Sequence, residues 1–254
     1  MQGLKNKVIL ICGGGSGIGA ETARRLAAEG AQVAIGDINL DTAQSVASAI
    51  VETGQQAIAV HYDQADEASI QQLFDRTIDH FGKLDGVFAN AADLSIVFDD
   101  QDILHNDVRI WERSLSVNMT GTALIIRAAL PLLLKQGGGS IVCTSSSAST
   151  VGEEERPAYA ASKAGINALC RHVASRWGRE NIRCNAVAPG FIITETIQKN
   201  MPQKMLDKML RHVRSPRHGA TQDIAAAVTF LLSNDGEWVN GQVWHVNGGV
   251  TYSN

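Results

Sequence analysis

A glycine-rich turn joins the first apolar run of the chain to the first stretch of helical period. Residues 13–19 read GGGSGIG, after the run Lys7–Cys12 and before the helical pattern Glu21–Glu29. Glycine permits positive φ angles and a close approach of the backbone to a ligand. The amides that open the following helix then face outward, where the helix dipole favours an anionic group such as a pyrophosphate. Strand, glycine turn and helix in this order predict a dinucleotide-binding βα unit, although a merely tight turn is the alternative.

Short apolar runs alternate with stretches of helical period along the rest of the chain. This alternation predicts right-handed βαβ crossovers and an α/β fold, a Rossmann-like, doubly wound parallel sheet flanked by helices on both faces. No linker or repeat divides the sequence, so we expect one domain over residues 1–254. The predicted strands are Lys7–Cys12, Gln32–Asp37, Ala57–Tyr62, Leu84–Ala89, Ser140–Thr144, Ile182–Val187 and Gln242–Val246, and the predicted helices are Glu21–Glu29, Leu40–Glu52, Ala68–Phe81, Trp111–Lys135, Tyr159–Arg179 and Gln222–Ser233.

Composition and charge exclude several classes of protein. The 254 residues are 44% hydrophobic and suffice for a sizeable core, whereas no apolar run is long enough to predict a membrane span. A signal-peptide pattern is not found. The net charge of −4 gives no reason to expect nucleic acid or an anionic membrane as a partner. The histidines show no metal-ligand spacing, and the cysteines are far apart, so we expect reduced thiols in a cytoplasmic protein and no metal. The cysteines are Cys12, Cys143, Cys170 and Cys184.

Asp37 ends the second predicted strand, at the sheet edge where the glycine turn lies. A carboxylate at this point accepts hydrogen bonds from the adenosine ribose hydroxyls and repels a 2′-phosphate. No Lys or Arg stands at Ser16, Ile38 or Asn39, where a phosphate would find a partner. The sequence therefore predicts NAD(H) rather than NADP(H). Without the glycine turn, an ordinary turn or capping aspartate would be the better interpretation.

Tyr159 and Lys163 stand at positions i and i+4 of a predicted helix and therefore share one face. A phenol is a poor base at neutral pH, with a pKa of about 10. A nearby ammonium favours the phenolate and lowers that pKa, so the pair can exchange a proton with an alcohol oxygen. The same spacing also occurs on many solvated helix faces.

Four further polar residues are weaker candidates. Asp63 and Asn90 follow the third and fourth strands, where they would meet the adenine edge and the cofactor backbone. Ser146 follows the fifth strand within a cluster of serines, and composition does not choose among them. Asn118 lies inside a predicted helix, where Asn is a middling helix former.

Together these pieces resemble the short-chain dehydrogenase/reductase family over nearly the whole chain. The family motif T-G-x-x-x-G-x-G matches residues 12–19 with Cys12 in place of Thr, and N-N-A-G matches residues 89–92 in part, with Ala89 and Ala92 as departures. The family's helix Asn, its Ser, its Y-x-x-x-K and its P-G followed by Thr correspond to Asn118, Ser146, Tyr159, Lys163, Pro189, Gly190 and Thr194. We expect the departures to alter the bracing of the cofactor loops and to leave catalysis intact.

The resemblance implies a role for each catalytic position. Tyr159 would be the general acid/base, Lys163 would lower its pKa and hold the nicotinamide ribose, and Ser146 would orient the substrate oxygen. Asn118 would support a water-mediated proton relay to Lys163, and Thr194 with the backbone near Ile192 would meet the carboxamide. The expected cofactor contacts are Gly13, Ser16, Gly17, Ile18, Gly19, Asp37, Ile38, Asp63, Asn90, Tyr159, Lys163, Pro189, Gly190, Ile192 and Thr194.

Two aperiodic segments follow predicted strand ends. Residues 191–217 are expected to form a substrate lid, and in a helix their apolar residues make one stripe that would suit an apolar substrate or pack on its own domain or a neighbouring subunit. That stripe consists of Met201, Met205, Leu206, Met209 and Leu210. The acidic run Glu153–Glu155 and the acidic residues of 93–107 are most simply solvated loops. Those residues of 93–107 include Asp99, Asp100, Asp102 and Asp107.

The expected activity is NAD-dependent hydride transfer to or from a secondary alcohol or ketone, small to medium in size, apolar or cyclic. A 3-oxoacyl thioester reductase is the alternative enzyme, against which Asp37 argues because such reductases typically use NADPH. A protein that binds NAD(H) without turnover is the other class considered. The resemblance also implies a homo-oligomer, commonly a tetramer, with the helices after Trp111 and from Tyr159 at one interface.

Overall fold

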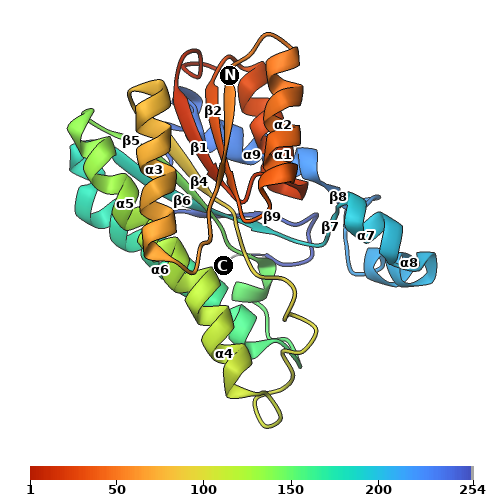
Figure 1. Cartoon of the computed structure of the whole chain (residues 1–254). Coiled ribbons are helices and arrows are strands. Elements are labelled where there is room, and N and C mark those ends of the chain that lie inside the picture. The colour runs from red at the N-terminus through yellow and green to blue at the C-terminus, as the bar shows by residue number, and fades with distance from the viewer. Residues whose placement is uncertain (253–254) are drawn as a thin grey trace.

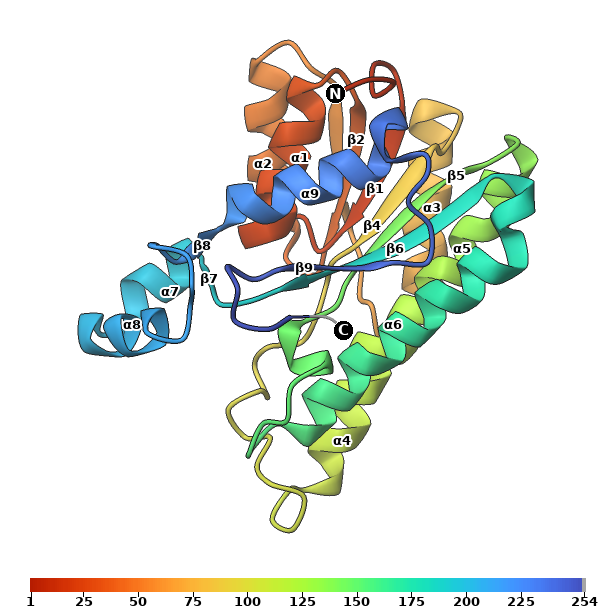
Figure 2. The same ribbon diagram turned by 180° about the vertical axis from the view of Figure 1, so that it is seen from behind.

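Seven strands form the central sheet of the computed structural model, which describes residues 1–252 (Figures 1 and 2). Their order is β3-β2-β1-β4-β5-β6-β9, and every neighbouring pair is parallel. The strands are β1 (Val8–Cys12), β2 (Gln32–Asp37), β3 (Ala57–His61), β4 (Gly86–Ala89), β5 (Gly139–Thr144), β6 (Ile182–Pro189) and β9 (Val243–Val246). The order reverses between β1 and β4, which is the switch point where doubly wound folds bind their ligands.

Helices cover both faces of the sheet (Figures 1 and 2). One core lies between the sheet and α1 (Gly17–Ala28), α2 (Leu40–Glu52) and α9 (Thr221–Leu232). The other lies between the sheet and α3 (Glu67–Phe81), α5 (Gly121–Lys135) and α6 (Pro157–Trp177). The five side chains of β1 are all buried, as expected for a strand covered on both faces. The predicted α/β, doubly wound parallel fold is confirmed, and the predicted elements are present with shifts at their ends, apart from the helix predicted from Trp111.

The long predicted helix from Trp111 is not regular. It begins as α4 (Val108–Ser114), passes through a π-helical turn, η1 (Leu115–Thr120), and continues as α5. The whole stretch of 28 residues is long and apolar enough to cross a membrane by length and composition alone, but half of its apolar window is buried inside the protein. The buried side of α5 joins the core with α3 and α6, so the stretch serves as a core helix.

The segment expected to be a lid forms two short helices rather than one. Strands β7 (Ile192–Ile193) and β8 (Gly219–Ala220) pair with each other, and between them lie α7 (Glu195–Asn200) and α8 (Gln203–Leu210). Pro202 separates the helices because it has no N–H to donate and its φ is fixed. Met201 therefore lies outside α8, and the expected single apolar stripe is wrong at that position.

Arg183 of β6 fixes the end of α9 to the sheet. Its guanidinium donates hydrogen bonds to the carbonyls of Leu231 (2.7 Å), Gly236 (2.9 Å) and Ser233 (3.0 Å). These carbonyls lie at or beyond the helix C-terminus, where backbone acceptors lack helical partners.

We expect Arg183→Met to lower the free energy of unfolding by about 2 kcal/mol, because several partly buried acceptors lose a charged donor. Urea denaturation measures this. Arg179→Met is the matched control, since Arg179 is exposed and forms no hydrogen bond or ion pair within residues 1–252. Equal destabilisation by both substitutions would contradict the account.

Candidate active site

The glycine turn packs so tightly against α1 that side chains are excluded. Gly13 and Gly17 have φ of +81° and +52°, a region that L-residues rarely adopt. A Cβ on Gly19 would lie 1.9 Å from the carbonyl oxygen of Gly13. The first turn of α1 therefore approaches the loop directly.

Asn90 ties this loop to the middle of the sheet. Its Nδ2 donates to the carbonyl of Gly13 (2.9 Å), and its Oδ1 accepts from Thr144 Oγ1 (3.0 Å). The amides of Asn90 and Ala91 both donate to the carbonyl of Cys12. These hydrogen bonds hold the glycine turn even though Cys12 stands where the family motif has Thr, and the Cys12 side chain is fully buried. The Asn90 side chain, expected against the cofactor, is engaged in this brace.

Asp37 lies against the glycine turn as expected. Its Oδ2 accepts from the amide of Gly15 (2.8 Å) and its Oδ1 from the amide of Asn39 (3.0 Å). Each carboxylate oxygen has a second lone pair, so the group can still accept from ribose hydroxyls. Ile38 beside it is 61% exposed. Asp63, at the next strand end, accepts from the amide of its own turn at Ala65 (2.8 Å).

Tyr159, Lys163 and Ser146 meet where β5 ends and α6 begins. Lys163 Nζ lies 5.7 Å from the centroid of the Tyr159 ring and donates to the carbonyl of Thr144 (2.8 Å). Ser146 lies close enough to the Tyr159 side chain to lower its pKa, and its Oγ accepts from the amide of Ala148 (3.2 Å). Helical spacing brings Tyr159 and Lys163 to one face, and the parallel pairing of β5 brings Ser146 to them.

The structure also distinguishes among the clustered serines. Ser145 donates to the carbonyl of Lys163 (3.3 Å), and Ser147 accepts from Asn247 (3.2 Å). Both hydroxyls are thereby engaged in holding the backbone and the C-terminal segment. Ser146 is the serine of this cluster that acts on the pKa of the Tyr159 phenol.

Burial controls the proton affinities of this group. Burial raises the pKa of Tyr159, and the hydrogen bond with Ser146 and the charge of Arg156 offset part of that rise. Burial also lowers the pKa of Lys163 to about 8. The pKa of Tyr159 is therefore raised overall, the opposite of the expected direction, because desolvation outweighs the contact with Ser146 and the charge of Arg156.

Asn118 lies in the π-helical turn and is fully buried. Its Oδ1 accepts from the amide of Asp93 (2.9 Å), and its Nδ2 lies 3.5 Å from Ser162 Oγ. The irregular turn breaks the usual helical hydrogen-bond pattern at this point, as π-turns at functional sites commonly do. The side chain thus holds the start of the 93–107 loop, a contact that sequence spacing does not reveal.

The remaining predicted contacts lie at the end of β6 and in the segment that follows it. Pro189 ends β6, and Gly190 approaches Asn247 so closely that a Cβ would lie 2.9 Å from that residue's Cβ. Thr194 caps α7 by accepting from the amide of Ile197 (3.3 Å). A Cβ on Gly17 would lie 3.4 Å from the Thr194 methyl group, so the segment that opens the expected lid reaches the glycine turn.

Three cysteines that are distant in sequence converge beneath Lys163. Cys143, Cys170 and Cys184 come from β5, α6 and β6, and their sulfur atoms lie within 4.8 Å of one another. All three are buried, and hydrogen bonds with the Cys170 and Cys184 thiols, with a smaller contribution from the Lys163 charge, lower the pKa of Cys143. Linear spacing did not predict this cluster because three separate elements build it.

Comparisons with known proteins agree with this geometry. A family model described as enoyl-(acyl carrier protein) reductase matches residues 13–251. A probable short-chain type dehydrogenase/reductase of Bradyrhizobium diazoefficiens is 36% identical over 250 residues, 98% of this chain and 89% of the relative. The chain belongs to the short-chain dehydrogenase/reductase family. The resemblance predicted from its motifs is confirmed, and so is the expectation of an oxidoreductase.

Two further members of the family are named more specifically. A cis-4-hydroxycyclohexanecarboxylate dehydrogenase of Sinomonas cyclohexanicum is 36% identical over 251 residues, 98% of each chain. The solved structure of a 7α-hydroxysteroid dehydrogenase complexed with NADH and 7-oxoglycochenodeoxycholic acid superimposes with a TM-score of 0.90. That structure is 34% identical and covers 97% of this chain and 94% of its own.

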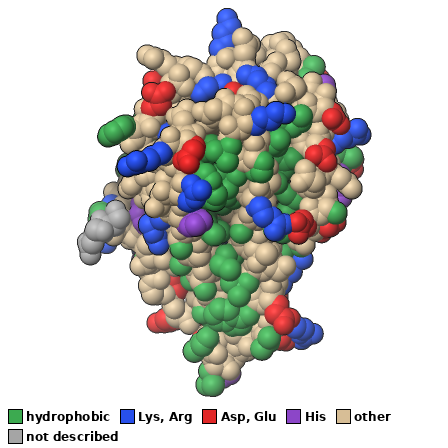
Figure 3. Space-filling model, turned by 90° about the vertical axis from the view of Figure 1, so that its left-hand side faces the viewer, with side chains coloured by type: hydrophobic (Ala, Val, Ile, Leu, Met, Phe, Trp, Pro, Cys, Tyr) green, Lys and Arg blue, Asp and Glu red, His purple; other side chains and the backbone are tan. Residues whose placement is uncertain are grey.

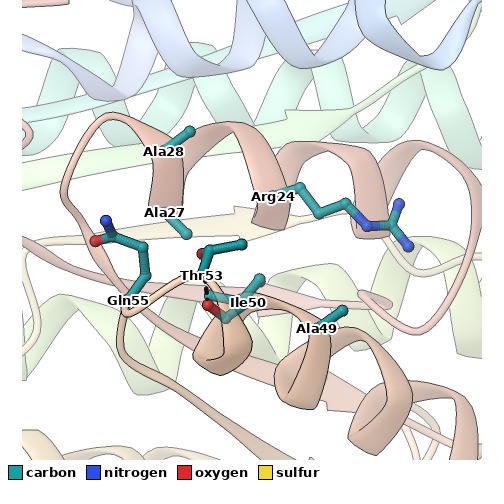
Figure 4. Close-up of a pocket in the computed structure, with 7 residues that line it drawn as sticks. All are labelled: Arg24, Ala27, Ala28, Ala49, Ile50, Thr53 and Gln55. Atoms are coloured by element: carbon teal, nitrogen blue, oxygen red, sulfur yellow. Dashed lines mark hydrogen bonds between the residues drawn. The ribbon is translucent and has the colours of Figure 1, made fainter.

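A separate hollow lies between the C-terminal ends of α1 and α2 (Figure 4). Arg24, Ala27, Ile50 and Gln55 are among its lining residues, and none of the predicted short-chain dehydrogenase/reductase site residues is. Helices that follow parallel strands run back along the sheet, so this hollow lies toward the edge opposite the glycine turn.

Lys163 gives a measurable dependence of stability on pH. Its pKa is about 8 in the folded protein and near 10.4 in an unfolded chain, so between these values the unfolded chain binds more protons. The free energy of unfolding therefore rises with pH in this window. Relative to Lys163→Met, the wild type should gain about 2–3 kcal/mol between about pH 8 and pH 10 in denaturant titrations. A difference that does not change with pH would contradict the burial of a titrating ammonium.

Proposed function

We propose that the protein is an NAD-dependent oxidoreductase that transfers a hydride between nicotinamide and a secondary alcohol or ketone. The observation that carries this proposal is the meeting of Tyr159, Ser146 and Lys163 at the same sheet edge as the glycine turn. A proton-exchanging phenol next to a dinucleotide-binding turn is what oxidation of an alcohol requires.

The residues around the glycine turn fit a dinucleotide. The backbone amides of Ser16, Gly17 and Ile18 would hold the pyrophosphate, because they open α1 and carry its positive dipole end. Asp37 would accept from the adenosine ribose hydroxyls. Lys163 would hold the other ribose, and Thr194 would contact the carboxamide. The turn also packs closely at Gly15, where a Cβ would lie 2.4 Å from Thr42 Oγ1. This close packing supports a loop whose shape is fixed for a ligand.

The chain's own residues handle the proton. NAD(H), when bound, supplies the acceptor or donor of the hydride. Ser146 would donate a hydrogen bond to the substrate oxygen and hold it beside the phenol. The Tyr159 hydroxyl would give its proton to that oxygen in reduction and take it back in oxidation. The buried Lys163 ammonium would stabilise the phenolate that forms when the proton leaves.

We propose an apolar or cyclic substrate. The 93–107 loop, which follows the carboxyl end of β4, and α8 present exposed apolar side chains, among them Leu94, Phe98 and Met205. The similar proteins named above act on a cyclohexane ring and on a steroid, which supports a ring-bearing alcohol. The description of the matching family model favours an acyl-carrier-protein thioester as the second candidate. Asp37 argues against the NADPH-dependent form of that second reaction.

The assembly and the domain are also proposals. Residues 1–254 would form one domain, with the lid built in at 191–217, in a cytoplasmic protein.

Apolar side chains gather on the side of the molecule where α3 and α5 lie (Figure 3), and Ile70, Leu124 and Leu132 line a groove there. We propose that this face, with α6, packs against further copies of the chain to give a homo-oligomer, commonly a tetramer in this family.

Turnover is the first test. The purified protein should reduce NAD⁺ in the presence of cyclic secondary alcohols, followed by absorbance of NADH, and should act poorly on 3-oxoacyl thioesters. Tyr159→Phe should lower kcat at least about 100-fold, the scale of a lost general acid/base, and leave NADH affinity near the wild-type value. Full activity of the variant would reject the role of Tyr159, and thioester-only activity would favour the second candidate.

Asp37 tests the choice of cofactor. Asp37→Ala should weaken NADH binding and raise NADPH binding relative to it, because the variant loses a ribose acceptor and a charge that repels the 2′-phosphate. The ratio of NADH affinity to NADPH affinity should fall by about 10–100-fold in fluorescence titrations, which is equivalent to the loss of one or two charged hydrogen bonds. Glu52→Ala serves as the control, because Glu52 is an exposed carboxylate at the C-terminal end of α2 and is not among the expected cofactor contacts. Unchanged selectivity in Asp37→Ala would show that another residue discriminates.

A further inference from the structure

An aspartate from the 93–107 loop closes the N-terminus of the helix that carries Tyr159. The helix's own N-cap residue, Arg156, makes no side-chain cap and has a positive φ of 68°. Asp100 caps the helix instead: its Oδ2 accepts from the amide of Tyr159 (2.8 Å) and its Oδ1 from the amide of Ala158 (3.3 Å). The amide of Arg156 in turn donates to the carbonyl of Asp100 (2.9 Å). The loop and the first turn of α6 are thus joined by side chain and backbone.

The Asp100 side chain is held in one place by burial and by its partners. The residue is 2% exposed, although its composition suggested a solvated loop. A buried carboxylate is stable only where donors satisfy it, and the open amides of a helix N-terminus are such donors. Asn106 Nδ2 also donates to Oδ1, while its own Oδ1 has no hydrogen-bond partner in the described part of the chain. The geometry therefore leaves the carboxylate little freedom to move.

The same loop is fixed at its other end to Asn118. The amide of Asp93 donates to Asn118 Oδ1 (2.9 Å), and the Asp93 carboxylate pairs with Arg113 (2.7 Å). Figures 1 and 2 show the loop beyond the carboxyl edge of the sheet, beside the segment that leads into α6. Phe98, between the two anchors, is 86% exposed. One loop therefore joins exposed apolar side chains to the elements that carry Asn118 and Tyr159.

We propose that Asp100 is a positioning residue for the reaction: it holds the first turn of α6, and with it the Tyr159 phenol, in register with the 93–107 loop. This inference rests on the proposed function of Tyr159. Asp100 acts through backbone amides and need not touch the substrate. Because a catalytic group displaced by about 1 Å can lose roughly 100-fold in rate, loss of this anchor acts on turnover more than on binding.

Three variants test the proposal. Asp100→Ala removes the anchor, Asp100→Asn keeps one acceptor oxygen and offers an NH₂ to the unpartnered Asn106 oxygen, and Asp99→Asn changes the exposed neighbour. We expect kcat to fall about 100-fold in Asp100→Ala and to recover to within roughly 10-fold in Asp100→Asn, with NADH affinity near wild type throughout. Asp99→Asn should match the wild type. Unchanged kcat in Asp100→Ala, or NADH affinity that falls in step with kcat, would overturn the proposal.

Hydrogen exchange separates failure of this inference from failure of the proposed function. The amides of Ala158 and Tyr159 should be protected in the wild type and in Asp99→Asn, and should exchange at least about 10-fold faster in Asp100→Ala, since they lose their acceptor. A wild type without turnover would reject the proposed function, and the exchange measurement would still test the anchor. Equal exchange in the wild type and Asp100→Ala would overturn the anchor itself.

Discussion

All strands of the central sheet run in one direction, and the placement of the site depends on this constraint. Parallel pairing brings the carboxyl ends of β1, β2, β4, β5 and β6 to a single edge. The glycine turn, Asp37, Asn90, Ser146 and Pro189 lie at or just beyond those ends, so this edge brings them together although they are scattered along the sequence. Parallel strands also need crossover helices, which bury both faces and free the edge for loops.

Hydrogen bonds between loops then give that edge its fixed shape. The Asn90 side chain connects the glycine turn to the Thr144 hydroxyl. The Thr144 carbonyl in turn accepts a hydrogen bond from the Lys163 ammonium. The cofactor side and the catalytic side therefore share one chain of contacts. Because Lys163 and Asn118 are buried, their polar groups must be satisfied, and this requirement fixes their positions more strictly than packing alone would.

The periodicity of the sequence was sufficient to predict the sheet and most of its helices, since glycine turns and apolar runs report local geometry, whereas the family was found through the resemblance of several motifs together. Motif positions such as Asn118 and Ser146 were found through the family resemblance, not through spacing. What the sequence could not reveal were contacts made across elements. Asp100 looked like a solvated loop residue because its helix partner lies far along the chain. Likewise, burial reversed the expected direction of the Tyr159 pKa, and desolvation depends on neighbours that no local pattern names.

The central claim is that the glycine turn, Asp37 and Lys163 form one dinucleotide site at this edge. A crystal structure of the protein with NADH tests it most directly. The account predicts the pyrophosphate over the amides of residues 16–18, the adenosine ribose hydroxyls within hydrogen-bonding distance of Asp37, and the nicotinamide ribose at Lys163. NADH bound in the hollow between α1 and α2, or with its adenosine ribose away from Asp37, would contradict it.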